Sequence, residues 1–537
     1  MTMTPVEEGS RSRDEGTPSK MAGLPEDASQ WTAKLRRKAL TYLPPEKLMP
    51  DRQPEYVSSW IYVFGVLTLS AFLVVAISGA LLALEGPSWW HESGLGHFVN
   101  SLHLWSVELF FLFMVVHLWG KFFMAAWRGK RSLTWITGVL AFLTSVGAAF
   151  TGYVSQQNFD SQWISTQAKD GMNSMGIGAF FNVLNFGQMF MWHILLLPLI
   201  VLLIVGVHVM QVRLRGVVPP IKANSDPMAD SKPWSGKYRP YDIIKEFTIG
   251  FVVVAIATLL FSFVFSSPDM APVTIKSWSH ADPVDFVTTA ASELAGTSAT
   301  ATYGAPYNNV PGTGQKLGPI SIENAVGVHI PVNPTVDFVL APLSTVPNNP
   351  ALTTAIQTWK SASTQQQTIW MAAYDKALNK AKQTAGDSVS MPSSNSGPVP
   401  ELMNQELVMA QSGGLDGALE SSTQFYGTNY TKPLLFIADG GYLASLAQAD
   451  HLTGSQWGMM NETGSYPGQA WLWLYTMWYQ VKPYSTSTNA DVEVMATMIV
   501  LTLALALVPF IPGLRAIPEK VGIYKLIWKD YYRSNKS

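Results

Sequence analysis

The sequence predicts an all-α integral membrane protein. We expect a transmembrane four-helix bundle, two further transmembrane helices, and a mixed or irregular extracytoplasmic domain inserted before the last helix. The 537-residue chain is 48% hydrophobic and only 13% charged, whereas charged residues make up about a quarter of a typical soluble chain. Six apolar segments are also long enough to cross a bilayer, which takes about 20 residues. They lie at about 59–84, 101–126, 133–154, 189–212, 246–266 and 492–514.

The positive charges predict how the spans are oriented. Nine Lys and Arg residues precede the first span, and the connections after the second and fourth spans hold four and seven. The connection between the first and second spans holds none. Because Lys and Arg collect on the cytoplasmic side of a membrane, we expect both termini in the cytoplasm and the long segment before the last span outside.

The chain then divides into five parts. Residues 1–58 are polar and are expected to be a mostly disordered cytoplasmic tail, although Trp31 to Tyr42 is amphipathic and suits the membrane surface. The other parts are the bundle at 59–220, a cytoplasmic connection with the fifth span at 221–266, the outer domain at 267–491, and the sixth span with a cytoplasmic tail at 492–537.

The outer domain contains three recognisable stretches. Ala351 to Thr384 has helical character, whereas Pro433 to Leu446 suggests a strand, a turn and a helix. Pro467 to Val481 is rich in aromatic residues and too short to span a bilayer. We expect this last stretch to be an interfacial helix immediately before the sixth span.

Four histidines form two matched pairs within two spans. His103 and His117 are fourteen residues apart, and His193 and His208 are fifteen apart. Since four turns of an α-helix take about 14.4 residues, each pair lies on one face, with its members roughly 21 Å apart along the axis. Ionisable residues inside membrane helices usually indicate function. Two such helices side by side would present facing imidazoles at two depths, which is the geometry needed to hold two stacked haems.

The composition limits how a haem can be held. The chain has no cysteine, which excludes disulfides, iron–sulfur clusters and covalent attachment of haem through thioethers. The haems are therefore expected to be two non-covalent b-type groups. The net charge of −2 argues against a nucleic-acid partner. The other five histidines are expected to be surface or structural residues, because no metal-ligand spacing links them.

Four glycines follow the same spacing as the histidines. Gly65 and Gly79 lie in the first span, and Gly138 and Gly152 lie in the third, each pair fourteen residues apart. Glycine within a helix costs about 1 kcal/mol relative to alanine, and small residues often serve ordinary helix packing in membranes. The register that they share with the histidines favours a second purpose, which is to let a flat macrocycle approach the backbone.

These residues resemble the four-helix haem-binding core of the cytochrome b/b6 family, the quinol-oxidising subunit of cytochrome bc complexes. The similarity covers about residues 55–220 and includes LHLWSVELFFLFMVVH and RSLTWITGVLAFLTSVGAAFTGY. The fifteen-residue gap resembles the b6-type branch. The resemblance implies a bacterial plasma-membrane protein with iron ligands His103 and His193 at the outer haem and His117 and His208 at the inner haem. It also implies haem-facing Gly65, Gly79, Gly138 and Gly152, and Arg131 near the inner haem.

The sequence departs from the family pattern around the outer quinol site. Asn100 stands where the family usually has an Arg, and Gly152 and Tyr153 lead into VSQQNFD instead of a Pro-Trp segment. The Pro-Glu-Trp-Tyr motif, which supplies a proton-accepting Glu, is absent. We expect Glu462 or, as a weaker alternative, Asp160 to accept a quinol proton, although only proximity supports Glu462 and the sequence favours an ordinary surface position for it.

The resemblance implies an electron-transfer subunit of a quinol-oxidising complex. It would oxidise menaquinol near the outer face and pass electrons through two haems across the membrane. The separate partners would be a Rieske-type iron–sulfur protein and a c-type cytochrome, with membrane lipid around the chain and a homodimer as a further possibility. Two alternatives stay open, because the quinol motif is lost: a transmembrane electron conduit without a bifurcating site, and a haem-containing assembly anchor.

Overall fold

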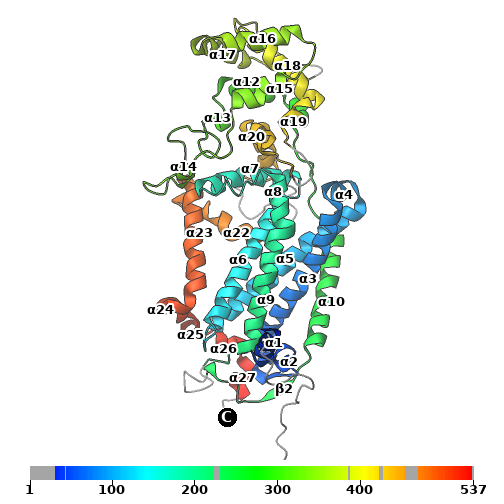
Figure 1. The fold of residues 1–537 in the computed structure, drawn as a ribbon, viewed down its shortest axis with the longest axis vertical. Helices are drawn as coiled ribbons and strands as arrows, with labels where there is room; N and C mark the ends of the chain where they lie inside the picture. The colour runs from blue at the N-terminus through cyan, green and yellow to red at the C-terminus, as the bar shows by residue number, and fades with distance from the viewer. Residues whose placement is uncertain are drawn as a thin grey trace, which may run out of the picture.

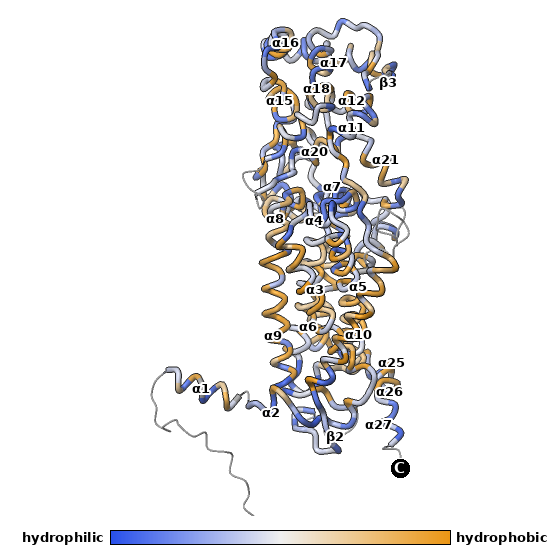
Figure 2. The backbone as a smooth tube through the Cα atoms, turned by 90° about the vertical axis from the view of Figure 1, so that its right-hand side faces the viewer, coloured by the Kyte–Doolittle hydropathy of each residue, from blue (hydrophilic) through white to orange (hydrophobic). Residues whose placement is uncertain are grey.

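A computed structural model describes residues 31–42, 44–221, 230–384, 387–421, 427–453 and 470–534. Long helices run side by side through the lower part of the molecule, and an elongated domain extends from one end of them (Figure 1). Helix α1 and the C-terminal helices lie at the opposite end. The hydrophobic residues form a continuous band along the long helices, and the outer domain is more polar (Figure 2).

All six predicted spans are confirmed as long apolar helices, so the chain is a multi-pass membrane protein. Each covers the predicted segment and is extended or shortened by a few residues at its ends. They are α3 (Val63–Glu85), α5 (Gly94–Phe123), α6 (Ser132–Val154), the continuous run α8–η3–α9 (Phe186–Met191, Trp192–Leu196 and Leu197–Arg215), α10 (Ile243–Phe265) and α23 (Ala490–Leu507), followed by η9 (Val508–Phe510).

The spans pack as two helix pairs with peripheral partners. Helix α3 packs against α5, α6 packs against α9, and α10 lies against both α3 and α5. A Cβ atom added to Gly250 of α10 would lie 3.2 Å from Ser70 of α3, which shows that a small residue sets this close approach. Helix α23 contacts α6. The four helices α3, α5, α6 and α9 therefore form the predicted bundle.

The end that carries both termini is more ordered than the sequence suggested. The amphipathic stretch is helix α1 (Trp31–Tyr42), as predicted, but the expected disorder was wrong for residues 44–58. Strand β1 (Arg52–Pro54) pairs antiparallel with β2 (Tyr238–Pro240). The buried Tyr56 donates a hydrogen bond to the Val217 carbonyl at 3.2 Å. The short elements here are α2 (Pro45–Leu48), η1 (Glu55–Ser58), η2 (Trp60–Tyr62), α24 (Pro512–Arg515), α25 (Ile517–Val521), α26 (Tyr524–Ile527) and α27 (Lys529–Ser534).

The outer domain is mostly helical and shares its core with the connection between α6 and α8. Its hydrophobic core includes Phe159 and Trp163 of α7 (Phe159–Ser174) together with Trp278 and Phe286. The other helices are α4 (Pro87–Glu92), α11 (Ile275–Ala281), α12 (Pro283–Ala295), α13 (Ala299–Thr302), α14 (Ile322–Val326), η5 (Thr335–Leu340), α15 (Ala341–Leu343), α16 (Pro350–Ser361), α17 (Thr364–Leu378), α18 (Val399–Ser412), α19 (Gly414–Leu419), α20 (Thr431–Asp439) and α21 (Tyr442–Ala449). One two-stranded sheet, β3 (Lys382–Thr384) with β4 (Ser388–Ser390), completes the described part.

Two of the three expectations for this domain are confirmed, and one is wrong in part. Helices α16 and α17 lie in the stretch expected to be helical, and η7 (Ala470–Leu472) with α22 (Trp473–Trp478) lies where the interfacial helix was expected. The strand expected from Pro433 is instead helix α20. Pro433 stands in the first turn, where its missing N–H is not needed, and Leu435, Phe436 and Ile437 are buried.

Buried carboxyl groups lie inside the outer domain. Glu406 of α18 and Glu293 of α12 are both 0% exposed, and neither Glu406 oxygen has a hydrogen-bond partner among the described residues. Burial raises the pKa of Glu406 well above its usual value. Burial, reinforced by Asp439, also raises the pKa of Glu293. Above the ordinary carboxyl pKa, Glu406 and Glu293 therefore keep protons in the folded domain that they would release in the unfolded chain.

We predict that the outer domain loses stability as pH rises. A raised folded-state pKa means that the folded carboxyl keeps its proton while the unfolded one ionises. Such a group therefore lowers the free energy of unfolding progressively as pH rises above the ordinary carboxyl pKa. Glu406→Met should raise the melting temperature at pH 7 and flatten its pH dependence in thermal unfolding scans. Glu420→Gln, at an exposed position, is the control, and equal pH slopes in the two variants would contradict the prediction.

Candidate functional site

The four histidines of the two spans face one another inside the bundle. His103 of α5 and His193 of η3 have ring centroids 6.1 Å apart and nearly perpendicular rings. His117 and His208 form the second pair, toward the end that carries the termini. Two metal–imidazole bonds of about 2 Å each, together with the half-width of each ring, account for a separation of this size. Both predicted pairs are therefore brought together.

Each imidazole is seated against one glycine of the neighbouring helix. A Cβ atom added to any of the four predicted glycines would lie between 2.4 and 3.1 Å from a histidine Cε1 atom. Real Cβ atoms essentially never come closer than 3.0 Å to such neighbours, so a side chain at Gly152 would push its ring aside, and one at the other three positions would require a shift of a few tenths of an ångström. The pairs are Gly65 with His117, Gly79 with His103, Gly138 with His208 and Gly152 with His193. The structure places an imidazole against each glycine, and the approach of a macrocycle to these glycines stays a prediction.

Hydrogen bonds at Nδ1 set the ring orientation of three histidines. His193 Nδ1 lies 2.9 Å from the Ala148 carbonyl, and His208 Nδ1 lies 3.0 Å from the Thr134 carbonyl. A carbonyl only accepts, so in both rings Nδ1 carries the proton and Nε2 keeps its lone pair. His103 Nδ1 lies 3.0 Å from Ser78 Oγ, whose own proton goes to the Val74 carbonyl at 2.8 Å. Such contacts fix the tautomer of metal-ligating histidines.

The fifteen-residue spacing of the second pair is explained by a π-helical turn. Pro198, which has no N–H to donate to the Ile194 carbonyl, lies just after η3, and η3 contains His193. A π turn accommodates one more residue than an α turn. The helix between His193 and His208 therefore keeps both side chains on one face, as fourteen residues do in α5.

These observations fit haem as the cofactor. The site offers neutral imidazoles with free Nε2 atoms, held in pairs and backed by glycine. Nδ1 of His117 has no hydrogen-bond partner among the described residues, so this ring lacks the restraint that the other three share. Arg131, expected near the inner haem, is 6% exposed and donates to the backbone carbonyls of Gly216, Arg215 and Asp230 at 2.7 to 2.9 Å. The structure thus shows Arg131 joining the start of α6 to the loop after α9.

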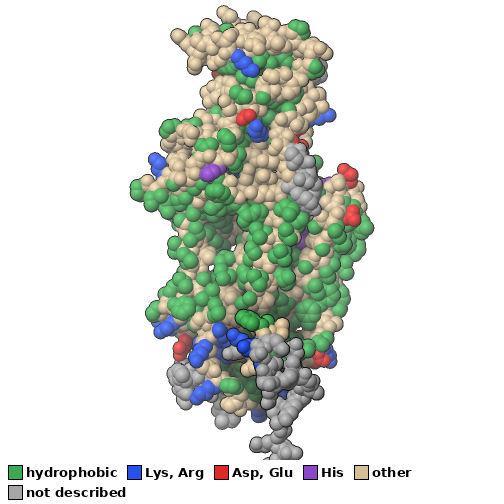
Figure 3. Space-filling view, in the orientation of Figure 1, with side chains coloured by type: hydrophobic (Ala, Val, Ile, Leu, Met, Phe, Trp, Pro, Cys, Tyr) green, Lys and Arg blue, Asp and Glu red, His purple; other side chains and the backbone are tan. Residues whose placement is uncertain are grey.

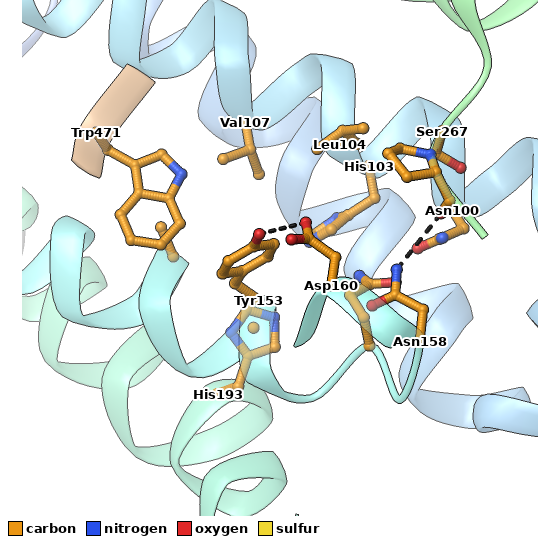
Figure 4. A pocket seen from close by; sticks show the side chains of 14 residues that line it. Asn100, His103, Leu104, Val107, Tyr153, Asn158, Asp160, His193, Ser267 and Trp471 are labelled. Carbon is orange, nitrogen blue, oxygen red and sulfur yellow. Dashed lines mark hydrogen bonds between the residues drawn. The ribbon is translucent and has the colours of Figure 1, made fainter. Parts of the chain in front are cut away.

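A cavity opens beside the outer histidine pair (Figure 4). The space between its walls is about 590 Å³, a figure that includes open solvent at its mouth. Tyr153, at the end of α6, donates its hydroxyl proton to the carboxylate of Asp160 on α7. Asp160 is 1% exposed, and Trp471 forms another wall. The other lining residues are Asn100, His103, Leu104, Val107, Ala149, Gly152, Gln156, Asn158, His193, Ser267 and Pro268.

The cavity contains polar groups that the sequence analysis ranked low or missed. Asp160 was the weaker of two candidate bases, whereas the stronger candidate, Glu462, lies outside the described residues. The Asn100 side-chain oxygen is buried without a hydrogen-bond partner among the described residues, so it offers an acceptor to a bound hydroxyl. The available signal was the VSQQNFD segment after Tyr153, which departs from the family pattern and contains Asp160.

Comparison with known proteins agrees with this geometry. The family described as Cytochrome b(N-terminal)/b6/petB matches residues 108–272. The chain is similar to the cytochrome bc complex cytochrome b subunit of Chlorobaculum thiosulfatiphilum, with 28% identity over 195 residues, or 31% of this chain and 44% of that subunit. It thus spans less than half the length of that relative.

Two further relatives are matched over most of their length. Cytochrome b6 of Heliobacterium mobile is 26% identical over 190 residues, which cover 31% of this chain and 89% of that protein. The menaquinol:cytochrome c reductase cytochrome b subunit of Geobacillus thermodenitrificans is 24% identical over 204 residues, or 33% of this chain and 88% of the subunit. The shared region is about a third of this chain.

The glycine contacts predict a selective loss of one haem. A Cβ atom at Gly152 would lie 2.4 Å from Cε1 and 2.7 Å from Nδ1 of His193, so Gly152→Ala should displace this ring and lower the haem content from two to about one per chain. Gly147→Ala on the same helix meets nothing within 4 Å and should leave both. Haem extraction from the purified variants measures the ratio, and equal ratios would contradict the assignment.

The π turn predicts opposite effects on haem binding for two single-residue deletions, one in the α8–η3–α9 span and one in α5. Removing Leu195 should convert η3 into an α turn and leave fourteen residues between the histidines, so both haems should be retained. Removing Leu112 from α5, which has no π turn, should rotate His103 by about 100° relative to His117 and abolish haem binding. Both leucines are about half-exposed to lipid, at 51% and 55%. Equal haem content in the two variants would count against the role of the π turn.

Proposed function

Because residues 108–272 belong to the cytochrome b N-terminal/b6 family, we propose that this chain is the di-haem electron-transfer subunit of a quinol-oxidising respiratory complex. The family implies haem b as the cofactor. His103 with His193 would hold an outer haem, and His117 with His208 an inner one. The observation that carries the proposal is the set of four paired imidazoles, each seated against a glycine.

The residues of the chain prepare these sites for electron transfer. The Nδ1 hydrogen bonds of His103, His193 and His208 keep the rings neutral and directed into the bundle. When bound, two haems would supply one-electron transfer between two depths of the membrane.

Charge and architecture support the proposed orientation. Lys and Arg side chains gather at the end of the molecule that carries both termini (Figure 3), which by the positive-inside rule would be cytoplasmic. The outer domain and the cavity would then face the outside of a bacterial plasma membrane. Since the chain has no cysteine, the second electron acceptor would be a separate protein of Rieske type, with a c-type cytochrome beyond it.

The cavity beside the outer histidines suits the oxidation of a quinol such as menaquinol. Asp160 and Tyr153 form a hydrogen-bonded pair in its wall, and a buried carboxylate can take a proton from a quinol hydroxyl. Asn100 offers an acceptor nearby. Asp160 would thereby take over the role of the missing motif glutamate, with Glu462 as the other candidate.

A second candidate function is a haem-containing conduit or assembly anchor without quinol oxidation. The observation that favours it is the loss of the Pro-Glu-Trp-Tyr motif together with the changed connection after α6. A reduced-minus-oxidised spectrum of the purified protein, recorded with dithionite and with a menaquinol analogue, separates the two. Two b-type haems reduced promptly by the quinol support the first function, whereas reduction by dithionite alone supports the second.

We predict that Asp160→Asn slows quinol-driven haem reduction at least about a hundredfold, as expected for removal of a general base. Tyr153→Phe should have a smaller effect in the same direction. Asp170→Asn is the matched control, because Asp170 lies on the same helix and accepts a hydrogen bond from Tyr303 at 2.6 Å outside the cavity. Stopped-flow absorbance measures the rates. If Glu462→Gln is slow and Asp160→Asn is not, the proton acceptor is Glu462.

A further inference from the structure

Two histidines and one aspartate that the sequence analysis treated as unrelated meet at the outer end of the bundle. His91 belongs to α4, His97 lies in the first turn of α5, and Asp269 follows α10. His91 Nδ1 lies 2.6 Å from one carboxylate oxygen of Asp269, and His97 Nδ1 lies 3.6 Å from the other. The three side chains are 24% to 31% exposed, so the cluster reaches the outside water.

The His91 ring is held with both nitrogens protonated. Its Nε2 lies 2.9 Å from the backbone carbonyl of Gln156, which can only accept, while its Nδ1 faces the Asp269 carboxylate. A ring that donates from both nitrogens is an imidazolium. Burial lowers the pKa of His91, but the contacts with Asp269, aided by the Gln156 carbonyl and by Glu92, outweigh it and raise the pKa overall.

A thin wall separates this cluster from the cavity beside the outer histidines. Gln156 lines the cavity, and its carbonyl is the one that accepts from His91. Pro268 also lines the cavity and directly precedes Asp269. On the other side of the cluster, His97 Nε2 lies 2.8 Å from Ser266 Oγ, next to the cavity-lining Ser267. In the segment 266–269, Ser267 and Pro268 line the cavity, and the residues on either side of them contact the cluster.

We propose that His91, Asp269 and His97 form a proton-release relay for the outer cavity. The inference rests on the proposed quinol oxidation. A quinol that becomes a quinone gives up two electrons and two protons, and the electrons go to the acceptors of that proposed function. The His91 imidazolium first gives its Nδ1 proton to Asp269, from which a proton passes with His97 to the outside water, and the neutral ring that remains then takes up a proton that leaves the cavity. The cluster returns to its starting state after each transfer.

The full-length protein tests the relay with two variants and one matched control. Asp269→Asn and His91→Ala remove relay groups. Asp387→Asn breaks a similar arrangement in the outer domain, where His280 Nδ1 lies 2.9 Å from Asp387 and its Nε2 lies 3.2 Å from the Gln411 carbonyl, away from the cavity. We expect both relay variants to slow haem reduction by a menaquinol analogue at least about tenfold and to change its pH profile. The control should match the wild type, and haem content should stay equal in all.

One further measurement separates a relay from a purely structural contact, and another tests the pairing of His91 with Asp269 itself. Added imidazole should restore the rate of His91→Ala, which a structural contact alone would not allow, and this variant decides the matter if Asp269→Asn loses haem. Because the folded-state pKa of His91 is raised, its pairing stabilises the protein fully below about pH 6.5. The melting-temperature difference between wild type and Asp269→Asn should therefore shrink as pH rises above this value.

The outcomes distinguish the relay from the function on which it rests. A wild type that menaquinol reduces, with unchanged rates and pH profiles in both relay variants, overturns the relay and leaves the proposed function intact. Absence of rescue by imidazole in a slowed, haem-replete His91→Ala also overturns it. A wild type whose haems quinol does not reduce overturns both.

Discussion

Four imidazoles lie inside the bundle, and their contacts determine how α3, α5, α6 and α9 fit together. Each ring lies against a gap in the neighbouring helix, and three of the four have a polar partner for Nδ1. The glycines provide the gaps, and the backbone carbonyls of Ala148 and Thr134 provide two of the partners. Helix α6 thus orients both rings of the α8–α9 span, and α3 seats both rings of α5. The packing of the bundle and the chemistry of its centre are set by the same contacts.

Much of the bundle could be predicted from the sequence because the signals are periodic and strong. Spans are defined by apolar length, and the histidine and glycine spacings match four helical turns. The π turn was harder to predict from the sequence. Its only signal is Pro198, and a proline inside a membrane helix is compatible with a kink as well as with a π turn. The same applies to α20, where a short apolar run without clear periodicity suits a strand or a buried helix equally.

The polar part of the site could not be predicted, because it is assembled from distant segments. His91 and Asp269 are 178 residues apart and meet only because α10 ends beside α4. Asp160 gained its place in the cavity from a capping box at the start of α7, in which Asn158 and Ser161 bind each other's backbone. Nothing in the local sequence states which cavity such a residue will enter. Pair spacing predicts sites within one helix far better than sites made by chain topology.

The insertion before the last span and the altered connection after α6 belong to one structural change. Gln162 of α7 exchanges two hydrogen bonds with the backbone of Val273, at 2.7 and 2.9 Å, and Trp163 donates to the Leu452 carbonyl at 3.0 Å. Phe159, next to Asp160, is fully buried in the core of the outer domain. The outer domain therefore holds helix α7, which carries Asp160, in place. The contacts of the inserted domain with α7 thus give a rigid support to the carboxylate that lines the cavity.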